Sequence, residues 1–363
     1  MIWRSSSAYP TLSMLPKLDG LWPPPAKSST PLSTAGFRRS REILSVLPAT
    51  LDLPIGSVIL MPESICWEAL SPILASSLKT EYYALGPKLN PDLGDIDRLW
   101  RQGGRSARAV YVVHYFGFEI DNLREIKEWC RKNGLYLIED CALSHYDGET
   151  NGGAGIDGDL AFFSLWKTMP IPEGALATKK GVVLELPVQR SLGCLEGVLR
   201  CSLRGWRRVR RSVPERGVDP DPVLTSMYGM CRVARWIWCR LNAREAGQIR
   251  RRNFEFLLEG LNKQNRLKPL RTDLGPRAVP YSLPLIVDDA QAFQDYMRAK
   301  GSATELGLNR SRHEKKSLGI GLGALSDRVV AIPCHQGLSD SDLNFLRDSS
   351  HCFLNLMHEI SVS

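Results

Sequence analysis

The sequence lacks several features that would place it in a membrane or outside the cell. It has no uninterrupted apolar run of the roughly 18 residues that a membrane-spanning helix needs. Its first residues, MIWRSSSAYPTLSMLPKLDGLWPPP, carry Ser and Pro where a secretory signal peptide needs an apolar core. The nine cysteines are odd in number and include no Cys-x-x-Cys pair, so we expect neither a disulfide framework nor a zinc site. These absences favour the reducing cytoplasm and a protein without a metal centre.

The composition is that of an ordinary globular protein. The 363 residues are 43% hydrophobic and 24% charged, which argues against wholesale disorder, collagen-like chains and coiled coils. At about 150 residues per domain, this length predicts two domains. The net charge of +8 admits an anionic partner, but 14 arginines and only 4 acidic residues fall between Arg200 and Arg252. The basic character therefore belongs to one segment, and the rest of the chain is nearly neutral.

Three interpretations of this arginine- and tryptophan-rich segment stay open. Its arginines could be solvated side chains of amphipathic helices that pack on the body or at a subunit interface. Some could hold a nucleotide-sugar diphosphate through bidentate hydrogen bonds. A basic face with Trp anchors could also attach to an anionic membrane surface. Nucleic acid is not an expected partner, because no recognised motif accompanies the charge.

Strands and helices alternate from residue 56 onward, which predicts a mostly parallel sheet covered on both faces. The expected strands are Val58–Met61, Glu81–Leu85, Ala109–Val113, Leu135–Ile138, Leu160–Phe163 and Ala175–Thr178. We expect an N-terminal arm with a first helix (1–55), a large domain (56–190), the Arg/Trp-rich helical segment (191–250) and a small C-terminal domain (251–363). The last of these has predicted strands at Val279–Val287 and Val329–Ile332, and a helix at Arg251–Leu261.

Polar residues follow three of the predicted strands, where ligands bind in an open parallel sheet. His114 and Tyr115 follow one strand, Glu139-Asp140-Cys141 follow the next, and the third is followed by a hydroxyl and an amine, Ser164 and Lys167. A buried ion pair or solvated loop charges would explain this pattern. A lysine that forms a Schiff base with pyridoxal phosphate would explain it too, because that cofactor also needs an Asp for its ring nitrogen and hydroxyls for its phosphate.

The same residues carry a resemblance to a known family. The motifs are V-H-Y-F-G at 113–117, G-L-x-x-I-E-D at 134–140, G-D at 158–159, F-S-x-x-K at 163–167 and P-x-P-E-G at 170–174. In this order and spacing they resemble the DegT/DnrJ/StrS family of pyridoxal-phosphate-dependent sugar aminotransferases. The resemblance implies an α/β transferase of fold type I, with a mostly parallel large domain and a smaller α+β C-terminal domain.

The resemblance also implies roles for individual residues. Lys167 would be the Schiff-base lysine and the general base and acid, Asp140 the partner of the ring nitrogen, and Ser164 a phosphate ligand. An amino donor such as glutamate would be used to aminate a nucleotide-linked keto-sugar, in cell-surface polysaccharide or secondary-metabolite biosynthesis. Members that perform dehydration carry His at the lysine position, so Lys167 favours amino transfer.

Further site residues follow from the same resemblance. The cofactor site would also include Arg39, Ser40, Cys66, Trp67 and His114, and the substrate site Tyr115, Tyr228 and His335. A homodimer is expected, because sites in this fold are built at the subunit interface.

An alternative of a different class stays open. Arg39-Ser40 stands where the family has a Gly-Thr phosphate turn, and Met227 where it has an Asn. The chain could therefore be a catalytically silent relative, acting as a binding or regulatory protein or as a peripheral membrane partner through its arginine-rich segment.

Overall fold

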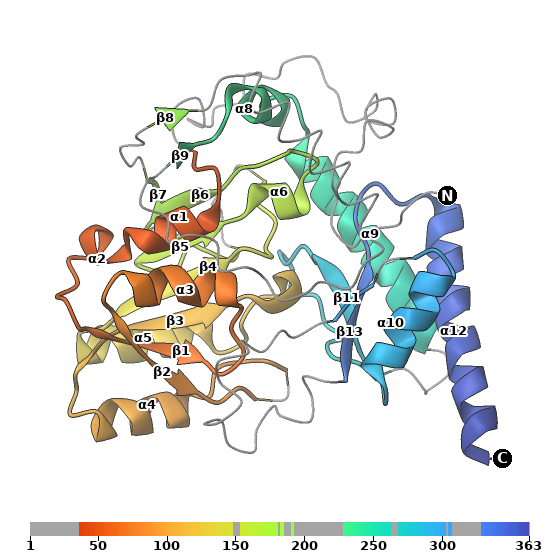
Figure 1. The fold of residues 1–363 in the computed structure, drawn as a ribbon, viewed down its shortest axis with the longest axis horizontal. Coiled ribbons are helices and arrows are strands. Elements are labelled where there is room, and N and C mark those ends of the chain that lie inside the picture. The colour runs from red at the N-terminus through yellow and green to blue at the C-terminus, as the bar shows by residue number, and fades with distance from the viewer. Residues whose placement is uncertain are drawn as a thin grey trace.

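The structure is a computed structural model of the chain, and it describes residues 36–86, 88–147, 153–180, 182–184, 190–191, 228–262, 268–302, 304–306 and 328–362. The described part is organised by a seven-stranded sheet and a four-stranded sheet, which lie side by side in Figure 1. A small pair, β8 (Arg190–Ser191) and β9 (Tyr228–Gly229), lies above the large sheet in that view.

The large sheet is mostly parallel. Its strand order is β2-β1-β3-β4-β5-β6-β7, and the pairs from β2 to β5 are parallel, whereas β6 and β7 run antiparallel to their neighbours. The bounds are β1 Val58–Pro62, β2 Lys79–Tyr83, β3 Ala107–Val113, β4 Tyr136–Cys141, β5 Leu160–Phe163, β6 Leu176–Lys179 and β7 Val182–Val183. The central strands are nearly continuous apolar runs because helices bury both of their faces.

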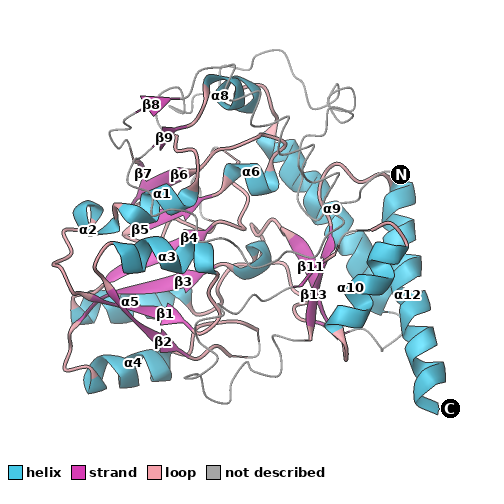
Figure 2. Ribbon diagram, viewed as in Figure 1, coloured by secondary structure: helices cyan, strands magenta, loops and turns pink. Residues whose placement is uncertain are grey.

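Helices cover the large sheet on its two faces, as Figure 2 shows. On one face, α1 (Ser40–Ser45), α2 (Leu47–Thr50) and α3 (Trp67–Ala75) share a core with Ile59, Tyr111 and Ile138. On the other face, α4 (Leu93–Gln102) and α5 (Leu123–Asn133) pack in a core with Leu60 and Val112. Successive side chains of a strand point to opposite faces, so the strand sequence decides which core each residue joins.

The smaller sheet is antiparallel and carries its own helices. Its order is β10-β11-β13-β12, with bounds Lys268–Pro269, Ser282–Ile286, Val329–Pro333 and Glu305–Leu306 in that order. It packs with α9 (Ala243–Asn262), α10 (Ala290–Ala299) and α12 (Asp340–Val362). Helix α9 runs from the neighbourhood of α8 (Arg232–Trp238) and α6 (Leu165–Thr168) to the smaller sheet, so it connects the two halves of the molecule (Figure 1).

Most of the predicted strands overlap the observed ones, with differences at two strands and one helix. Strand β4 extends to Cys141 instead of ending at Ile138, so Glu139, Asp140 and Cys141 form its end and do not follow it. The edge strand β2 spans Lys79–Tyr83 instead of the predicted Glu81–Leu85. An edge strand is half exposed, so its apolar pattern marks its ends poorly. Helix α9 begins at Ala243, eight residues before the predicted Arg251. The four-part division of the chain stays a prediction, and the arm before residue 36 and most of the arginine-rich segment lie outside the described residues.

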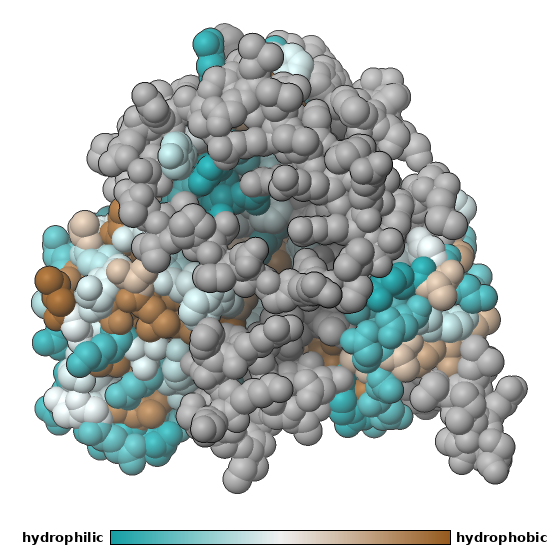
Figure 3. Space-filling view, in the orientation of Figure 1, coloured by the Kyte–Doolittle hydropathy of each residue, from teal (hydrophilic) through white to brown (hydrophobic). Residues whose placement is uncertain are grey.

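The described helices include none that is both long and apolar enough to cross a membrane. On the face of the molecule in Figure 3, hydrophobic side chains are visible over the side formed by α2 and α3. Leu74 of α3 is 42% exposed and Ile55, which follows α2, is 89% exposed.

Candidate active site

The carboxyl ends of the parallel strands bring the predicted site residues together. Asp140 lies on β4, Ser164 follows β5 directly, and Lys167 lies on α6, the short helix that follows Ser164. Asp140 and Lys167 are close enough to interact electrostatically, and the thiol of Cys66, which precedes α3, interacts with both. Three segments far apart in the sequence therefore meet at one edge of the sheet.

Asp140 is buried and its carboxylate is held at both oxygens. The hydroxyl of Tyr111 donates to Oδ2 at 2.6 Å, and the backbone N–H of Ala142 donates to Oδ1 at 2.9 Å. Burial raises the pKa of Asp140, while the two hydrogen bonds and the charge of Lys167 act in the opposite direction. The donors at both oxygens and Lys167 therefore offset part of the rise in the pKa of Asp140 that burial causes.

Two hydroxyls from distant parts of the chain meet beside Lys167. The Oγ atoms of Ser40, the first residue of α1, and Ser164 lie 2.8 Å apart and are hydrogen-bonded. The guanidinium of Arg39 lies over the ring of Trp166, with its carbon 4.2 Å from the ring centre. This cation–π contact, like the bond between the two hydroxyls, holds the start of α1 against the segment that carries Lys167. The group of donors suits a phosphate.

Lys167 is half-buried at the end of this group. Its backbone N–H donates to the carbonyl of Ser164 at 3.0 Å within the first turn of α6. Among the residues that the structure describes, its side-chain amine has no hydrogen-bond or ion-pair partner. A lysine that interacts with a buried carboxylate without forming a direct ion pair is placed to react with a carbonyl group.

Cys66 and Trp67 lie at the start of α3, at the same edge of the sheet. Burial raises the pKa of the Cys66 thiol to about 11, and the neighbouring Lys167 lowers it less than burial raises it. The thiol is therefore protonated near neutral pH, and Cys66 lines the site as a small, weakly polar group. Both residues are half-buried and pack against the core beneath α1 and α3.

His114 lies on the opposite face of the sheet from Asp140. Its Nε2 is 2.8 Å from Oε2 of Glu139, and its Nδ1 is 3.2 Å from the carbonyl oxygen of Phe118. Glu139 also accepts hydrogen bonds from the backbone N–H groups of Gly155 and Gly158. The structure thus argues against the predicted cofactor contact of His114, because alternation along the strands turns its ring away from the site.

His114, Glu139 and Cys141 bring their potential ligand atoms within 4.8 Å of one another. All three are buried, and burial raises the pKa of the Cys141 thiol well above its usual value. The hydrogen bonds of His114 and Glu139 account for this proximity without an ion. We interpret the group as a structural anchor for the loop that leads into β5.

The predicted substrate residues occupy three different settings. The hydroxyl of Tyr115 donates to the backbone carbonyl of Ser64, and thereby joins the ends of β3 and β1. The ring of Tyr228 lies beneath the guanidinium of Arg38, whose carbon is 4.6 Å from the ring centre. His335 is 2% exposed, and its Nδ1 accepts from the backbone N–H of Gly337 at 3.2 Å. Their contact with a substrate stays a prediction.

Arg250, which sequence analysis counted in the arginine-rich segment, is fully buried beside α6. It donates to Gln336 Oε1 at 2.7 Å, to the carbonyl of Thr168 at 2.9 Å and to the carbonyl of Tyr281 at 3.2 Å. Gln336 donates to the same carbonyl of Thr168 at 2.9 Å. Arg250 on α9 and Gln336, which follows β13, therefore both hold the backbone of Thr168, the residue after Lys167. Its place within a run of three arginines gave no sign of this burial.

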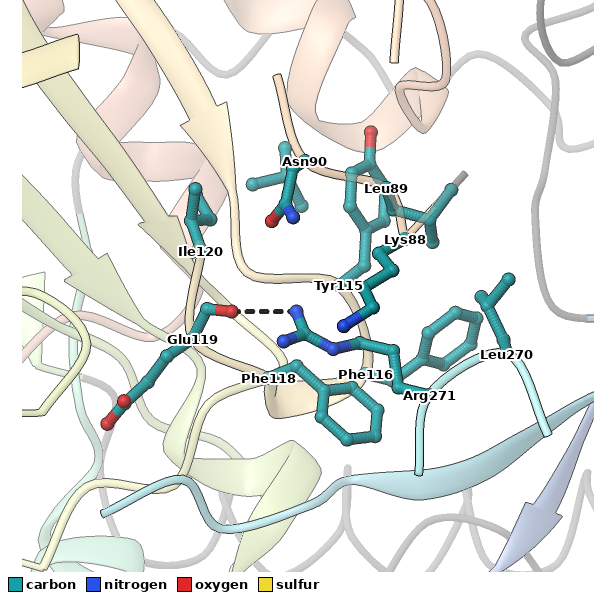
Figure 4. Close-up of a pocket in the computed structure, with 11 residues that line it drawn as sticks. Lys88, Leu89, Asn90, Tyr115, Phe116, Phe118, Glu119, Ile120, Leu270 and Arg271 are labelled. Atoms are coloured by element: carbon teal, nitrogen blue, oxygen red, sulfur yellow. Dashed lines mark hydrogen bonds between the residues drawn. The ribbon is translucent and has the colours of Figure 1, made fainter. Parts of the chain in front are cut away.

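A small pocket lies beside the site, between the loop after β3 and the smaller sheet (Figure 4). Arg271 crosses it and donates to the carbonyl of Glu119 at 2.8 Å and to Asp121 Oδ1 at 2.5 Å. Lys88 and Tyr115 line it from the large-sheet half. Arg271 thus links the smaller sheet to the loop that also carries Tyr115.

Part of the chain is similar in sequence to known aminotransferases. Residues 90–181 match the model of the DegT/DnrJ/EryC1/StrS aminotransferase family. One relative is the dTDP-4-dehydro-2,3,6-trideoxy-D-glucose 4-aminotransferase of Saccharopolyspora spinosa, 31% identical over 32% of this chain and 29% of the relative. Another is the GDP-perosamine synthase of Vibrio cholerae, 29% identical over 24% of each protein. These alignments span less than a third of either relative.

Solved structures match far more of the chain. The aminotransferase TlmJ from Streptoalloteichus hindustanus has a TM-score of 0.66 at 18% identity, over 90% of this chain and 87% of that one. Helicobacter pylori PseC, an aminotransferase involved in pseudoaminic acid biosynthesis, has a TM-score of 0.65 at 14% identity, over 88% and 86%. The chain has an aminotransferase fold. The predicted fold type I architecture is confirmed, as is the predicted family resemblance over residues 90–181.

Aminotransferases of this family depend on pyridoxal phosphate in general. The site offers the groups that this cofactor requires: an amine without a partner among the described residues, a buried carboxylate hydrogen-bonded at both oxygens, and paired hydroxyls, one of which follows Arg39 in the sequence. The donor set in the aminotransferase fold therefore fits the cofactor, although Ser40 replaces the usual Gly-Thr pair.

Proposed function

We propose that the chain is a pyridoxal-phosphate-dependent aminotransferase that transfers an amino group, with glutamate as the expected donor, to a nucleotide-linked keto-sugar. The observation that carries the proposal is the meeting of Lys167, Asp140 and the Ser40–Ser164 pair at one edge of the sheet. Such a reaction would serve cell-surface polysaccharide or secondary-metabolite sugar biosynthesis.

In this proposal Lys167 is the catalytic residue. Its amine would attach the cofactor and, once released, would move a proton from the substrate carbon to the cofactor carbon in the first half-reaction and in the reverse direction in the second. The half-buried position of Lys167 limits the access of water to this amine. Because α6 is fixed through Thr168 by Arg250 and Gln336, the amine is presented from a rigid turn.

Asp140 would pair with the ring nitrogen of the cofactor, and Ser40, Ser164 and Arg39 would hold its phosphate. Bound pyridoxal phosphate supplies the electron sink that makes removal of the substrate proton possible. The carboxylate of Asp140 would favour the protonated form of that nitrogen, in which the sink is strongest. Cys66 and Trp67 would line the face of the ring from the start of α3.

The sugar substrate is inferred from the relatives. One aligned relative is a dTDP-sugar 4-aminotransferase and another is a perosamine synthase, and both names specify a nucleotide-linked sugar. The proposal includes a homodimer, as the family resemblance implies. It also includes a cytoplasmic location, which the seven described cysteines, all without disulfide partners, support. The catalytically silent alternative is not favoured, because the lysine, the carboxylate and a phosphate-binding hydroxyl are all retained.

An absorbance titration tests the proposal. Addition of pyridoxal phosphate to the purified protein should produce a visible band that Lys167→Ala abolishes and that L-glutamate bleaches. Lys132→Ala, which removes an exposed lysine at the end of α5, is the matched control and should leave the band unchanged. Failure of the wild-type protein to produce a band at saturating cofactor would refute the proposed function.

A further inference from the structure

Tyr111 contacts the carboxylate on which the proposed chemistry depends. Its hydroxyl donates to Oδ2 of Asp140 at 2.6 Å, and both side chains are buried. In the parallel pairing of β3 with β4, Tyr111 lies opposite Ile138 and Val113 lies opposite Asp140. Residues two apart on a strand share a face, so Tyr111 and Asp140 point to the same side of the sheet.

The hydroxyl of Tyr111 is held in one place and keeps its proton. The ring packs against Phe162, with the ring centres 6.1 Å apart, and the Tyr111 carbonyl accepts a hydrogen bond of 2.8 Å from the hydroxyl of Tyr83. Burial, and then the charge of Asp140, raise the pKa of Tyr111 well above its usual value. The hydroxyl therefore acts as a donor throughout the working pH range.

We propose that Tyr111 is a positioning residue, whose hydroxyl holds Oδ2 of Asp140 in place and makes this carboxylate a weaker proton acceptor than it would be without the hydrogen bond, so that the shared proton stays on the ring nitrogen of the cofactor. The inference rests on the proposed function, in which Asp140 pairs with that nitrogen.

The physical argument concerns where one proton lies. A proton between a pyridine nitrogen and a buried carboxylate moves toward the oxygen as the carboxylate becomes more basic. Burial raises the pKa of Asp140, and the hydrogen bond from Tyr111 is the largest of the effects that lower it. Loss of the hydroxyl would leave a more basic carboxylate, held by the backbone of Ala142 alone among the donors described above.

The first test needs no cofactor. In protein labelled with ¹³C at the aspartate carboxyl carbons, the Asp140 signal is identified by its loss in Asp140→Asn. We expect Asp140 to titrate at higher pH in Tyr111→Phe than in the wild type. Tyr146→Phe is the matched control, because it removes the hydroxyl of a buried tyrosine whose ring packs against Phe163 and Trp238, away from Tyr111 and Asp140. Equal titration of Asp140 in the wild type and Tyr111→Phe would overturn the inference.

The second test follows the cofactor itself, using pyridoxal phosphate labelled with ¹⁵N in the ring. At a pH where the wild-type complex is protonated, Tyr111→Phe should move the ring signal toward its unprotonated position. We also expect the dissociation constant to rise about tenfold, the effect of one charge-assisted hydrogen bond. An unchanged ring signal would also overturn the inference. If the wild-type protein binds no pyridoxal phosphate, the proposed function fails, while the carboxyl titration still decides whether Tyr111 acts on Asp140.

A second variant covers the case in which Tyr111→Phe does not fold. Replacement of Tyr111 by 3-fluorotyrosine keeps the shape of the ring and makes the hydroxyl a stronger donor. We expect Asp140 to titrate at lower pH in this protein than in the wild type. An upward shift, or no shift, would contradict the proposed role.

Discussion

The buried carboxyl of Glu42 should make the stability of this chain fall as the pH rises. Glu42 lies on α1, two residues after Ser40, and its side chain is 0% exposed. Burial raises its pKa from 4.5 to about 7, while Arg38, a backbone hydrogen bond at Tyr228 and Arg41 act in the opposite direction. The Nε of Arg38 donates to Oε1 of Glu42 at 2.9 Å. This ion pair does not offset the free energy that the charged carboxylate loses when it is removed from water.

The sign and size follow from linkage between proton binding and folding. A carboxyl whose pKa is higher in the folded state binds its proton more tightly there, so its contribution is fully present below pH 4.5 and is lost as the pH rises through 7. A change from 4.5 to about 7 corresponds to about 3 kcal/mol in total. Between pH 5 and 7.5 the loss is about 2 kcal/mol.

Urea unfolding of the wild type and of Glu42→Gln at several pH values measures this loss. Other titrating groups are common to both proteins, so the difference between their unfolding free energies isolates Glu42. Relative to Glu42→Gln, the wild type should lose about 2 kcal/mol between pH 5 and 7.5. Glu68→Gln, which removes an exposed carboxylate from α3, controls for the loss of a charge. The reasoning would be refuted if the difference between the two unfolding free energies did not change with pH, or if the wild type became more stable relative to Glu42→Gln as the pH rises.

Three further predictions concern the boundary between the two sheets. Burial, and then the charge of Arg250, lower the pKa of His145 from 6.5 to about 4, so the folded state disfavours the protonated ring. As the pH drops from 6.5 to 4, the free energy of unfolding of the wild type, measured in urea, should therefore fall relative to that of His145→Gln. Arg250→Met leaves the carbonyl of Thr168 with one donor fewer and should cost about 3 kcal/mol of unfolding free energy, of which Arg250→Lys recovers part. Gly117 has a φ of +81°, and a Cβ there would lie 2.5 Å from the Val279 carbonyl oxygen, so Gly117→Ala should lower the thermal unfolding temperature by several degrees.

The large sheet and the centre of the site were predictable because both follow from local patterns. Apolar runs separated by amphipathic helices specify a parallel sheet, and polar residues after those runs must meet at its carboxyl edge. That argument selected Glu139-Asp140-Cys141 and the segment from Ser164 to Lys167 without knowledge of any contact, and the family resemblance singled out Asp140, Ser164 and Lys167 within them. Neither separated the two faces of the sheet, and His114, which the resemblance assigned to the cofactor, lies on the face opposite Asp140.

What sequence analysis could not predict are the contacts between distant segments. Ser40 and Ser164 were both expected in the cofactor site, but they are 124 residues apart, and their hydrogen bond depends on how α1 packs against α6. Arg250 stands in a run of three arginines on α9, yet it is the fully buried one, because the helix face that it occupies packs against α6 and β11. Charge counts treat these arginines alike, whereas packing distinguishes them.

Tyr111 was missed for a different reason, and the reason shows how the edge of the sheet is used. A tyrosine in the run AVYVV is most simply a core residue, and its ring does pack in the core. Its hydroxyl became informative only through the register of β3 with β4, which places it on the same face as Asp140. Strand alternation sends the neighbouring carboxyl, Glu139, to the other face, where His114 and two backbone N–H groups hold it. One strand therefore presents two adjacent acids on opposite faces: Glu139 anchors a loop, and Asp140, hydrogen-bonded by Tyr111, lies on the face where we propose that the cofactor binds.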